Sequence, residues 1–221
     1  MGKQADLLWV AIVGAVLVAA ATPRPLPQPY PGLDPHPPNQ PRPLIAVPVG
    51  CDNLLSRGCA VTSSDRNPSI GELSYVTDGD KEQDPGSYVE LGAGLQWVQI
   101  DLGEEKEVHA ICLWHFFEAY RIYYDVVVQI SSGPDFTDGV VTVFNNDMDN
   151  SAKLGAGTDK EYIESNYGRP FAVGAVKGRY VRCYSNGNSA NKMNHYLEVE
   201  VFGRPLPKKE PVKVDKPIDL F

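Results

Sequence analysis

The sequence predicts an all-β domain, a β-sandwich or jelly roll, between two proline-rich ends that are disordered or extended. Alternation of apolar and polar residues with period two recurs through the central segment, as in "QWVQIDL" and "YLEVEVFG". Clusters of Gly, Asn, Asp and Pro, such as "SSGPDFTDG" and "SNGNSANKMN", separate these runs. No long apolar pattern with the helical period of 3.6 competes with them, so short strands joined by turn-rich loops are expected.

Composition divides the 221 residues into four parts. Residues 1–21 have a lysine, an apolar run and small residues at a possible cleavage site, which is typical of a signal peptide. An uncleaved anchor is the alternative, and its retention would give the only membrane span expected. Proline makes up 11 of the 27 residues from Thr22 to Pro48, so residues 22–50 are expected to be an extended linker. Residues 51–203 form the domain, and residues 204–221 form a charged, proline-containing tail.

The strand pattern places specific residues inside the sandwich. Val98, Ile100 and Leu102 share one face of their strand. The run "HAICLWHF" is apolar at both odd and even positions, which favours a strand covered on both faces. In "YLEVEVFG", the residues expected to point inward are Leu197, Val199 and Val201, with Glu198 and Glu200 on the opposite side.

Net charge and cysteine content narrow the class of protein. A net charge of −8 argues against nucleic acid as a partner, because such binding needs a basic surface. Export would place the four cysteines in an oxidising compartment. A bridge between Cys51 and Cys59 is therefore an open alternative, and Cys112 and Cys183 are expected to be buried in strands.

The order of motifs resembles that of a discoidin domain, the coagulation factor V/VIII type C family. The elements that carry the resemblance are "VTDGD", "WVQIDLG", "RYVR" and "EVEVFG", between Asn53 and Gly203. The family has a galactose-binding-like fold and includes many bacterial carbohydrate-binding modules. The resemblance therefore implies a sandwich that binds its ligand with loops at one end.

The resemblance also implies a structural calcium ion beside the early acidic turn. The family pattern places the carboxylates of Asp78 and Asp80 there, with backbone carbonyls near Leu73 and Lys81. Glu198 in the last strand is the matching acid. Calcium takes six to eight oxygen ligands of these kinds. The alternative is an ordinary Asp-Gly turn.

Three loops carry the candidate ligand-binding residues. The aromatic loop "WHFFEAYRIYYD" suits a sugar site, because sugars stack on rings and need a few polar groups. The alternative is that most of its rings cover the core, with two or three side chains exposed. The other two loops are rich in amides, which bind sugar hydroxyls but also shape turns. The candidates are His115, Phe117 and Arg121 in the first loop, Asn145, Asn146 and Asp147 in the second, and Asn188, Asn191 and His195 in the third.

Signals for catalysis are weak. The four histidines lack the HxxxH or HxH spacing of a metal site, and there is no GxSxG motif. No acidic residue lies in an apolar run that would desolvate it, with Glu118 among aromatic residues the nearest case. The sequence thus predicts a non-enzymatic module that is secreted, periplasmic or on the cell surface. Its expected partner is a glycan, and the alternative is a protein of a cell-envelope assembly in an adhesion role.

Overall fold

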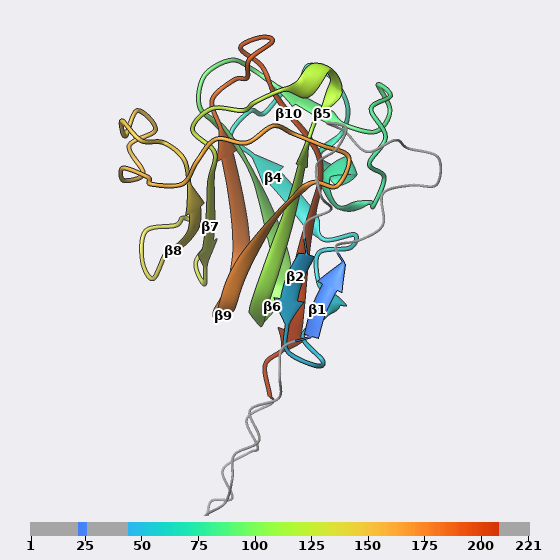
Figure 1. Ribbon diagram of the computed structural model, residues 1–221, viewed down its shortest axis with the longest axis vertical. Coiled ribbons are helices and arrows are strands. Elements are labelled where there is room, and N and C mark those ends of the chain that lie inside the picture. The colour runs from blue at the N-terminus through green and yellow to red at the C-terminus, as the bar shows by residue number, and fades with distance from the viewer. Residues whose placement is uncertain (1–21, 26–43, 208–221) are drawn as a thin grey trace, which may run out of the picture.

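The computed structural model describes residues 22–25 and 44–207, and these form a nearly all-β molecule (Figure 1). The proposed signal peptide and most of the proline-rich segment and the tail lie outside the described residues. The strands are β1 (Thr22–Pro25), β2 (Leu44–Val47), β3 (Asn53–Leu54), β4 (Ala60–Ser63), β5 (Val89–Leu91), β6 (Gln96–His115), β7 (Val127–Ser131), β8 (Val141–Asn145), β9 (Arg169–Ser185) and β10 (Asn194–Pro205). Two short 3-10 helices, η1 (Leu73–Thr77) and η2 (Glu118–Tyr120), complete the elements.

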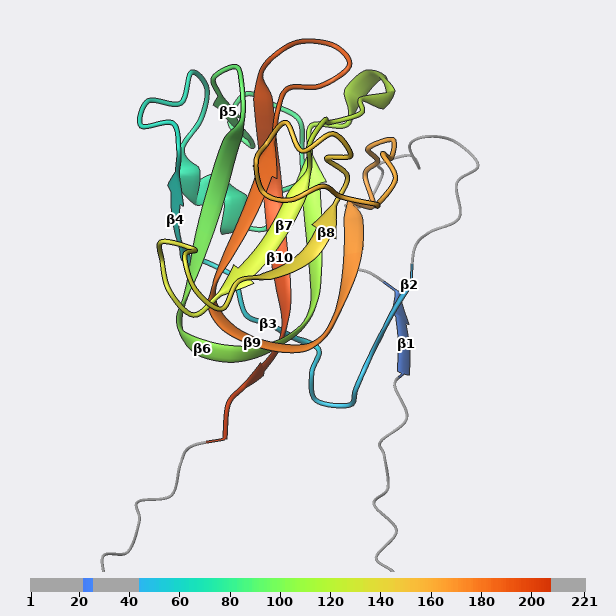
Figure 2. The same cartoon turned by 90° about the vertical axis from the view of Figure 1, so that its left-hand side faces the viewer.

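Two long strands, β6 and β9, build both layers of the sandwich. They pair antiparallel along their whole length, with a register shift between Asp101 and Lys106. Both bend sharply at this point (Figure 2). The first half of β6 pairs with β4, and the second half pairs with β10. The sheet order β3-β10-β6-β9-β7-β8 therefore folds over on itself, which confirms the predicted sandwich.

The main core lies between the two layers. It takes Val98 and Ile100 from one half of β6, and Ile111 and Leu113 from the other. All four side chains are fully buried. Burial of a large aliphatic side chain contributes about 1.5–3 kcal/mol, so this cluster is the main source of stability. The alternation of "QWVQIDL" is confirmed.

A second apolar cluster covers the outer face of the β6 and β10 layer. Cys112 and Trp114 of β6 lie in it, which confirms that this strand is covered on both sides. Ile45 and Val47 of β2 are also buried there. The folded unit therefore begins before the boundary expected at residue 51, because residues 44–47 pack on the sheet. It also extends past residue 203, since β10 continues to Pro205.

The last strand differs from the prediction at its start. Pairing with β6 shifts register between Tyr196 and Glu198, which marks a β-bulge. A bulge changes the face to which a side chain points. Leu197 consequently lies in the outer cluster, whereas Val199 and Val201 lie in the main core as expected.

All four cysteines are free. Cys112 and Cys183 are buried in strands, as predicted. The bridge between Cys51 and Cys59 that the sequence left open is not formed. The Cys59 thiol instead donates to the carbonyl of Leu55 at 3.3 Å.

Candidate functional site

The three loops chosen from the sequence meet at one end of the sandwich. The first and third are joined by backbone hydrogen bonds, among them Ser189 N–H to the Ile122 carbonyl at 2.9 Å. Asp125 connects them to the second loop, because its Oδ2 accepts from Asn186 Nδ2 at 2.7 Å and from Ser151 Oγ at 2.9 Å. The loops lie at the upper end in Figure 1.

Two of the aromatic-loop candidates are not exposed, contrary to prediction. His115 is fully buried and Phe117 is 3 % exposed. The reason is that β6 continues to His115, and Phe117 packs in the outer cluster. Nδ1 of His115 lies 2.7 Å from Oε1 of Glu164, and its ring stacks on Tyr123 with centroids 4.2 Å apart. The exposed rings of this loop are Tyr120 and Tyr124, at 46 % and 39 %.

Arg121 is half-buried rather than free in solvent. Its guanidinium carbon lies 4.5 Å from the centroid of the Phe116 ring. Its Nε and Nη1 atoms are buried and have no hydrogen-bond partner among the described residues. Unpaired buried donors carry a desolvation cost of about 1–3 kcal/mol, so this guanidinium is suited to bind a ligand oxygen.

His195 joins the aromatic loop to the strand layer. Its Nδ1 lies 2.9 Å from the Tyr123 hydroxyl, and its Nε2 lies 2.9 Å from Oε2 of Glu90. The side chain is 3 % exposed. Burial, together with the positive charge of Arg121, lowers the pKa of His195 to about 4.

This depressed pKa predicts a loss of stability in acid. The unfolded chain takes up a proton at His195 near its ordinary pKa of 6.5, whereas the folded chain does so only near 4. The contribution of His195 to the free energy of unfolding is therefore complete above pH 6.5, and it is lost as the pH falls towards 4, by about 1.4 kcal/mol per pH unit. The raised pKa of Glu198 changes stability in the opposite direction over this range, so the contribution of His195 is the difference between the wild type and His195→Gln. Urea unfolding between pH 7 and pH 4 should show the wild type losing stability relative to His195→Gln as the pH falls, and an equal pH dependence of the two proteins would contradict the assignment.

The amide-rich loops are held by their own hydrogen bonds. Asn145, Asn146 and Asp147 are buried, and Asp147 accepts from the backbone N–H groups of Ser151 and Ala152. Asn188 Nδ2 donates to Asn191 Oδ1 at 3.0 Å in the third loop. These residues shape the loops. Four of the five candidates among them are buried, and Asn191 is the exposed one.

Three carboxylates of the second loop region also gather. Asp125, Asp147 and Asp149 have oxygens within 4.8 Å of one another. Ser151 donates to all three, through its hydroxyl or its backbone N–H. A turn network accounts for this group, with hydrogen-bond donors already at each acid.

The acidic turn lies against the last strand, as the expected calcium site requires. The N–H of Gly79 donates to Oε2 of Glu198 at 2.9 Å. Glu198 is fully buried, and its Oε1 has no hydrogen-bond partner within residues 44–207. Burial raises the pKa of Glu198 to about 8. The expectation that no acid is desolvated is therefore wrong for Glu198, whereas Glu118 is exposed.

The two aspartates of the turn face their own loop. Asp78 Oδ1 accepts from the Asp80 N–H at 2.8 Å. Asp80 accepts from the Glu82 N–H and the Ser87 hydroxyl, both at 2.9 Å. Leu73, expected to lend a carbonyl, packs its side chain against the main core.

Two cations lie close to Glu198, which the sequence did not suggest. Nζ of the buried Lys81 is 2.8 Å from Oε1 of Glu200, and the Arg57 guanidinium donates to the carbonyl of Asp78. Gly79 has φ of +89°, and a Cβ there would meet the Arg57 guanidinium. Sequence reasoning considered only the carbonyl of Lys81, because the long-range contact with Glu200 has no local signal.

Sequence reasoning also missed a cavity of about 560 Å³ at the loop end. The backbone N–H of Glu164 donates to the carbonyl of Arg121 at 2.8 Å, which ties the cavity wall to the aromatic loop. Two buried oxygens of its lining residues, the Tyr162 hydroxyl and Glu164 Oε2, have no hydrogen-bond partner in the described part of the chain. The cavity is lined by Ile122, Glu161, Tyr162, Ile163, Glu164, Ser165, Tyr167, Gly168, Arg169 and Pro170.

The local sequence carried a modest signal for this cavity. The segment "EYIESNYGRP" combines two tyrosines and an arginine without strand alternation. Arg169 lies over the Tyr162 ring, with its guanidinium carbon 4.8 Å from the centroid. Gly168 has φ of +67°, and a Cβ there would meet the Trp114 ring at 2.5 Å, so glycine is required for the loop to approach the sheet.

Comparison with solved structures defines the fold class. The family 32 carbohydrate-binding module of AlyQ, in complex with 4,5-unsaturated mannuronic acid, superposes with a TM-score of 0.50 at 19 % identity. The match covers 68 % of this chain and 96 % of that one. Chitosan-binding module 1 from a Paenibacillus sp. IK-5 chitosanase/glucanase gives a TM-score of 0.50 at 18 % identity, covering 68 % of this chain and 99 % of that one.

A family 89 glycoside hydrolase from Clostridium perfringens matches with a TM-score of 0.51 at 19 % identity, over 74 % of this chain but only 16 % of that one. No family model and no curated protein matches the chain. The chain therefore has the galactose-binding-like β-sandwich fold of family 32 carbohydrate-binding modules. Membership of the discoidin family itself stays a prediction. Of the described helices, neither is long and apolar enough to cross a membrane.

Proposed function

We propose that the protein is a non-catalytic carbohydrate-binding module that holds a glycan at the loop end of the sandwich. The fold it shares with carbohydrate-binding modules supports this function. The observation that carries the proposal is the cavity beside Ile122, where the exposed Arg169 lies over the Tyr162 ring. Sugars stack on rings, and their hydroxyls accept hydrogen bonds from a guanidinium, so a ring and an arginine together suit a sugar.

Other groups at the same end add to the chemistry of a sugar site. Arg169 and Tyr162 lie face to face, and Arg121 has unpaired donors close behind the cavity wall. The exposed rings of Tyr120 and Tyr124 are available for stacking. The glycan site therefore centres on residues 120–124 and 161–170, in place of His115 and Phe117.

We propose that calcium stabilises the fold at the acidic turn. Glu198 fits this role, because it is buried with one oxygen unpartnered, and the turn offers backbone carbonyls. Asp78 and Asp80 would need to turn from their loop contacts to add ligands. Arg57 and Lys81 are the competing source of positive charge, so the proposal is open to a direct test.

The proposed location is outside the cytoplasm: secreted, periplasmic or on the cell surface. It is supported by the signal-like composition of residues 1–21 and by the proline-rich segment that follows. Weak binding per site would gain strength from several copies or from a linked second module, because linkage raises the effective concentration.

Arg169→Gln tests the glycan site without disturbing the core. Arg169 is an exposed residue of the cavity lining, so thermal stability should stay within about 0.5 kcal/mol of the wild type. Affinity for a bound oligosaccharide should fall about tenfold, as expected for one lost hydrogen bond of about 1.4 kcal/mol. A glycan array on the full chain, including uronic acid and chitosan oligomers, selects the ligand, and calorimetry then measures both proteins.

Lys177→Gln is the matched control for the change of charge, since Lys177 is exposed on β9 and lies outside the cavity lining. It should bind like the wild type. If Arg169→Gln also binds like the wild type, the cavity is not the glycan site. If no array glycan binds at millimolar concentration, the carbohydrate proposal fails and docking on an envelope protein takes its place.

A further inference from the structure

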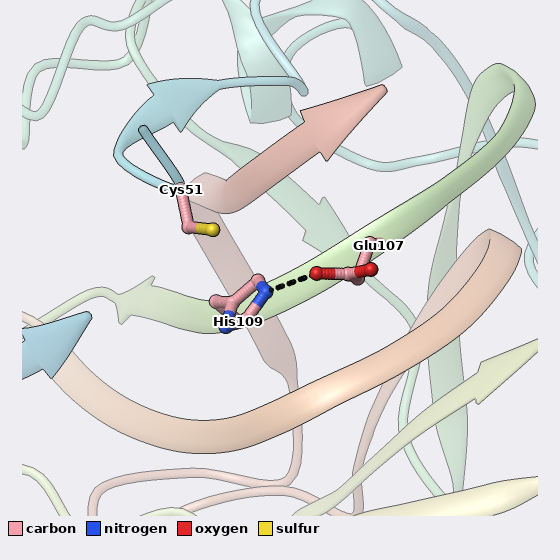
Figure 3. A group of neighbouring side chains, drawn as sticks. All are labelled: Cys51, Glu107 and His109. Carbon is pink, nitrogen blue, oxygen red and sulfur yellow. Dashed lines mark hydrogen bonds and ion pairs between the residues drawn. The ribbon is translucent and has the colours of Figure 1, made fainter. Parts of the chain in front are cut away.

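A cysteine, a histidine and a glutamate come together on the outer face of the layer that contains β10, away from the loops. Cys51 is fully buried, His109 is 8 % exposed, and the Glu107 side chain is 13 % exposed. One donor atom from each residue lies within 4.8 Å of the other two. Figure 3 shows the Cys51 thiol and the Glu107 carboxylate directed towards the imidazole. His109 Nε2 and Glu107 Oε1 are 2.8 Å apart.

The fold holds these three groups in place. Glu107 and His109 are two residues apart in β6, so their side chains share one face of the strand. Cys51 follows the turn that leads from β2 into the domain, and its N–H donates to the Pro48 carbonyl at 3.0 Å. Asn53 Nδ2 donates to the carbonyls of Gly50 and Gly203, at 2.9 and 3.1 Å, and fixes the turn to β10.

We propose that Cys51, Glu107 and His109 bind a zinc ion or a similar transition metal. Thiolate, imidazole and carboxylate are the three side-chain ligands that zinc takes in proteins, whereas calcium and magnesium take only oxygen. Bond lengths of about 2.0–2.3 Å in a tetrahedron bring ligand atoms to roughly 3.3–3.8 Å from each other. Small rotations of the side chains therefore complete the site, with a water as the fourth ligand.

Arg204 limits the affinity of this site. Its Nη2 lies 2.7 Å from the same Glu107 oxygen that contacts His109, and its side chain is 50 % exposed. The guanidinium competes with the metal for the carboxylate and repels a cation. Its removal should tighten metal binding, which a purely structural role for the three residues does not predict.

The bound metal connects the segment that enters the domain to β6. It would cross-link Cys51 to a strand 56 or more residues away in sequence, without a disulfide. This site is separate from the turn at Glu198 and shares no ligand with it, so the two metals are distinguishable. Zinc also requires the reduced thiol, and oxidation of Cys51 would abolish binding.

Cobalt(II) titration of the full, reduced chain tests the site, because a thiolate ligand gives a charge-transfer band in the near ultraviolet. The wild type should show the band with one ion per chain, and zinc should displace the cobalt. Loss of a residue that only hydrogen-bonds to a metal ligand lowers metal affinity about 10- to 100-fold. Cys51→Ser and His109→Gln should lose at least as much, and Arg204→Gln should bind more tightly than the wild type.

Cys59→Ser is the control for the thiol, since Cys59 is outside the group and donates to the Leu55 carbonyl. Its band should be unchanged, and Glu198→Gln should also bind cobalt normally. Absence of a band in the wild type, or loss of the band with Cys59→Ser but not with Cys51→Ser, would overturn the proposal. If Cys51→Ser fails to fold, Glu107→Gln provides a second test of the proposal. Equal cobalt affinity of Glu107→Gln and the wild type would show that the carboxylate is not a ligand.

Discussion

Replacement of His115 with Ala is expected to destabilise the domain by about 3–5 kcal/mol, because it removes a large buried ring and one partner of a buried hydrogen bond. His115 is fully buried, and Glu164 is 1 % exposed. The lost contact is the 2.7 Å hydrogen bond to Glu164 Oε1. Oε2 of Glu164 already has no partner among the described residues, so the whole carboxyl group would be left buried and unpaired. Urea unfolding at neutral pH measures the change.

A double-mutant cycle with Glu164→Ala separates the interaction energy of His115 and Glu164 from the cost of lost packing. The double variant should be less destabilised than the sum of the single variants, because it leaves no unpaired carboxyl behind. A change below about 1 kcal/mol for His115→Ala would mean that the ring carries little of the stability. His115 could then return as a binding residue, as the sequence alone had suggested.

The sequence predicts the sandwich well because its signal is local. Alternation in "QWVQIDL" and the doubly apolar run "HAICLWHF" each report which faces of β6 are buried. It does not predict that Ile45 and Val47 cover one of those faces, since the proline-rich composition around them favours an extended linker. Long-range packing decided this boundary, and local composition carries no information about it.

The site was harder to predict for the same reason. The convergence of the three loops follows from the fold family, and hydrogen bonds through Asp125 confirm it. The exposure of single residues does not follow from the fold family. His115 and Phe117 lie at the end of β6, and a small change in where the strand ends decides whether their side chains are buried. The sequence also placed Glu198 opposite Val199 correctly, yet its burial depends on Lys81, Trp114 and the turn at Gly79, all distant in sequence.

Chelation of calcium is expected to lower the stability of the wild-type protein by about 2.7 kcal/mol, relative to a hundredfold excess of calcium over its Kd. The physical reason is that a bound ion satisfies the buried Glu198 carboxylate, whose Oε1 lacks a partner within residues 44–207. Thermal unfolding with calcium and with a chelator measures the difference. Glu198→Gln should unfold at the same temperature in both, and Glu118→Gln, an exposed acid at the loop end, should respond like the wild type.

The pH dependence gives the same prediction a second, independent measurement. Without calcium, the folded protein keeps a proton on Glu198 up to about pH 8, whereas the unfolded chain loses it near 4.5. Stability from this group is therefore complete below pH 4.5 and falls as the pH rises through 8, by about 1.4 kcal/mol per unit. Calcium needs the ionised carboxylate, so it should cancel this fall. If chelator and pH have no such effect, the charges of Arg57 and Lys81 neutralise Glu198, and the acidic turn needs no ion.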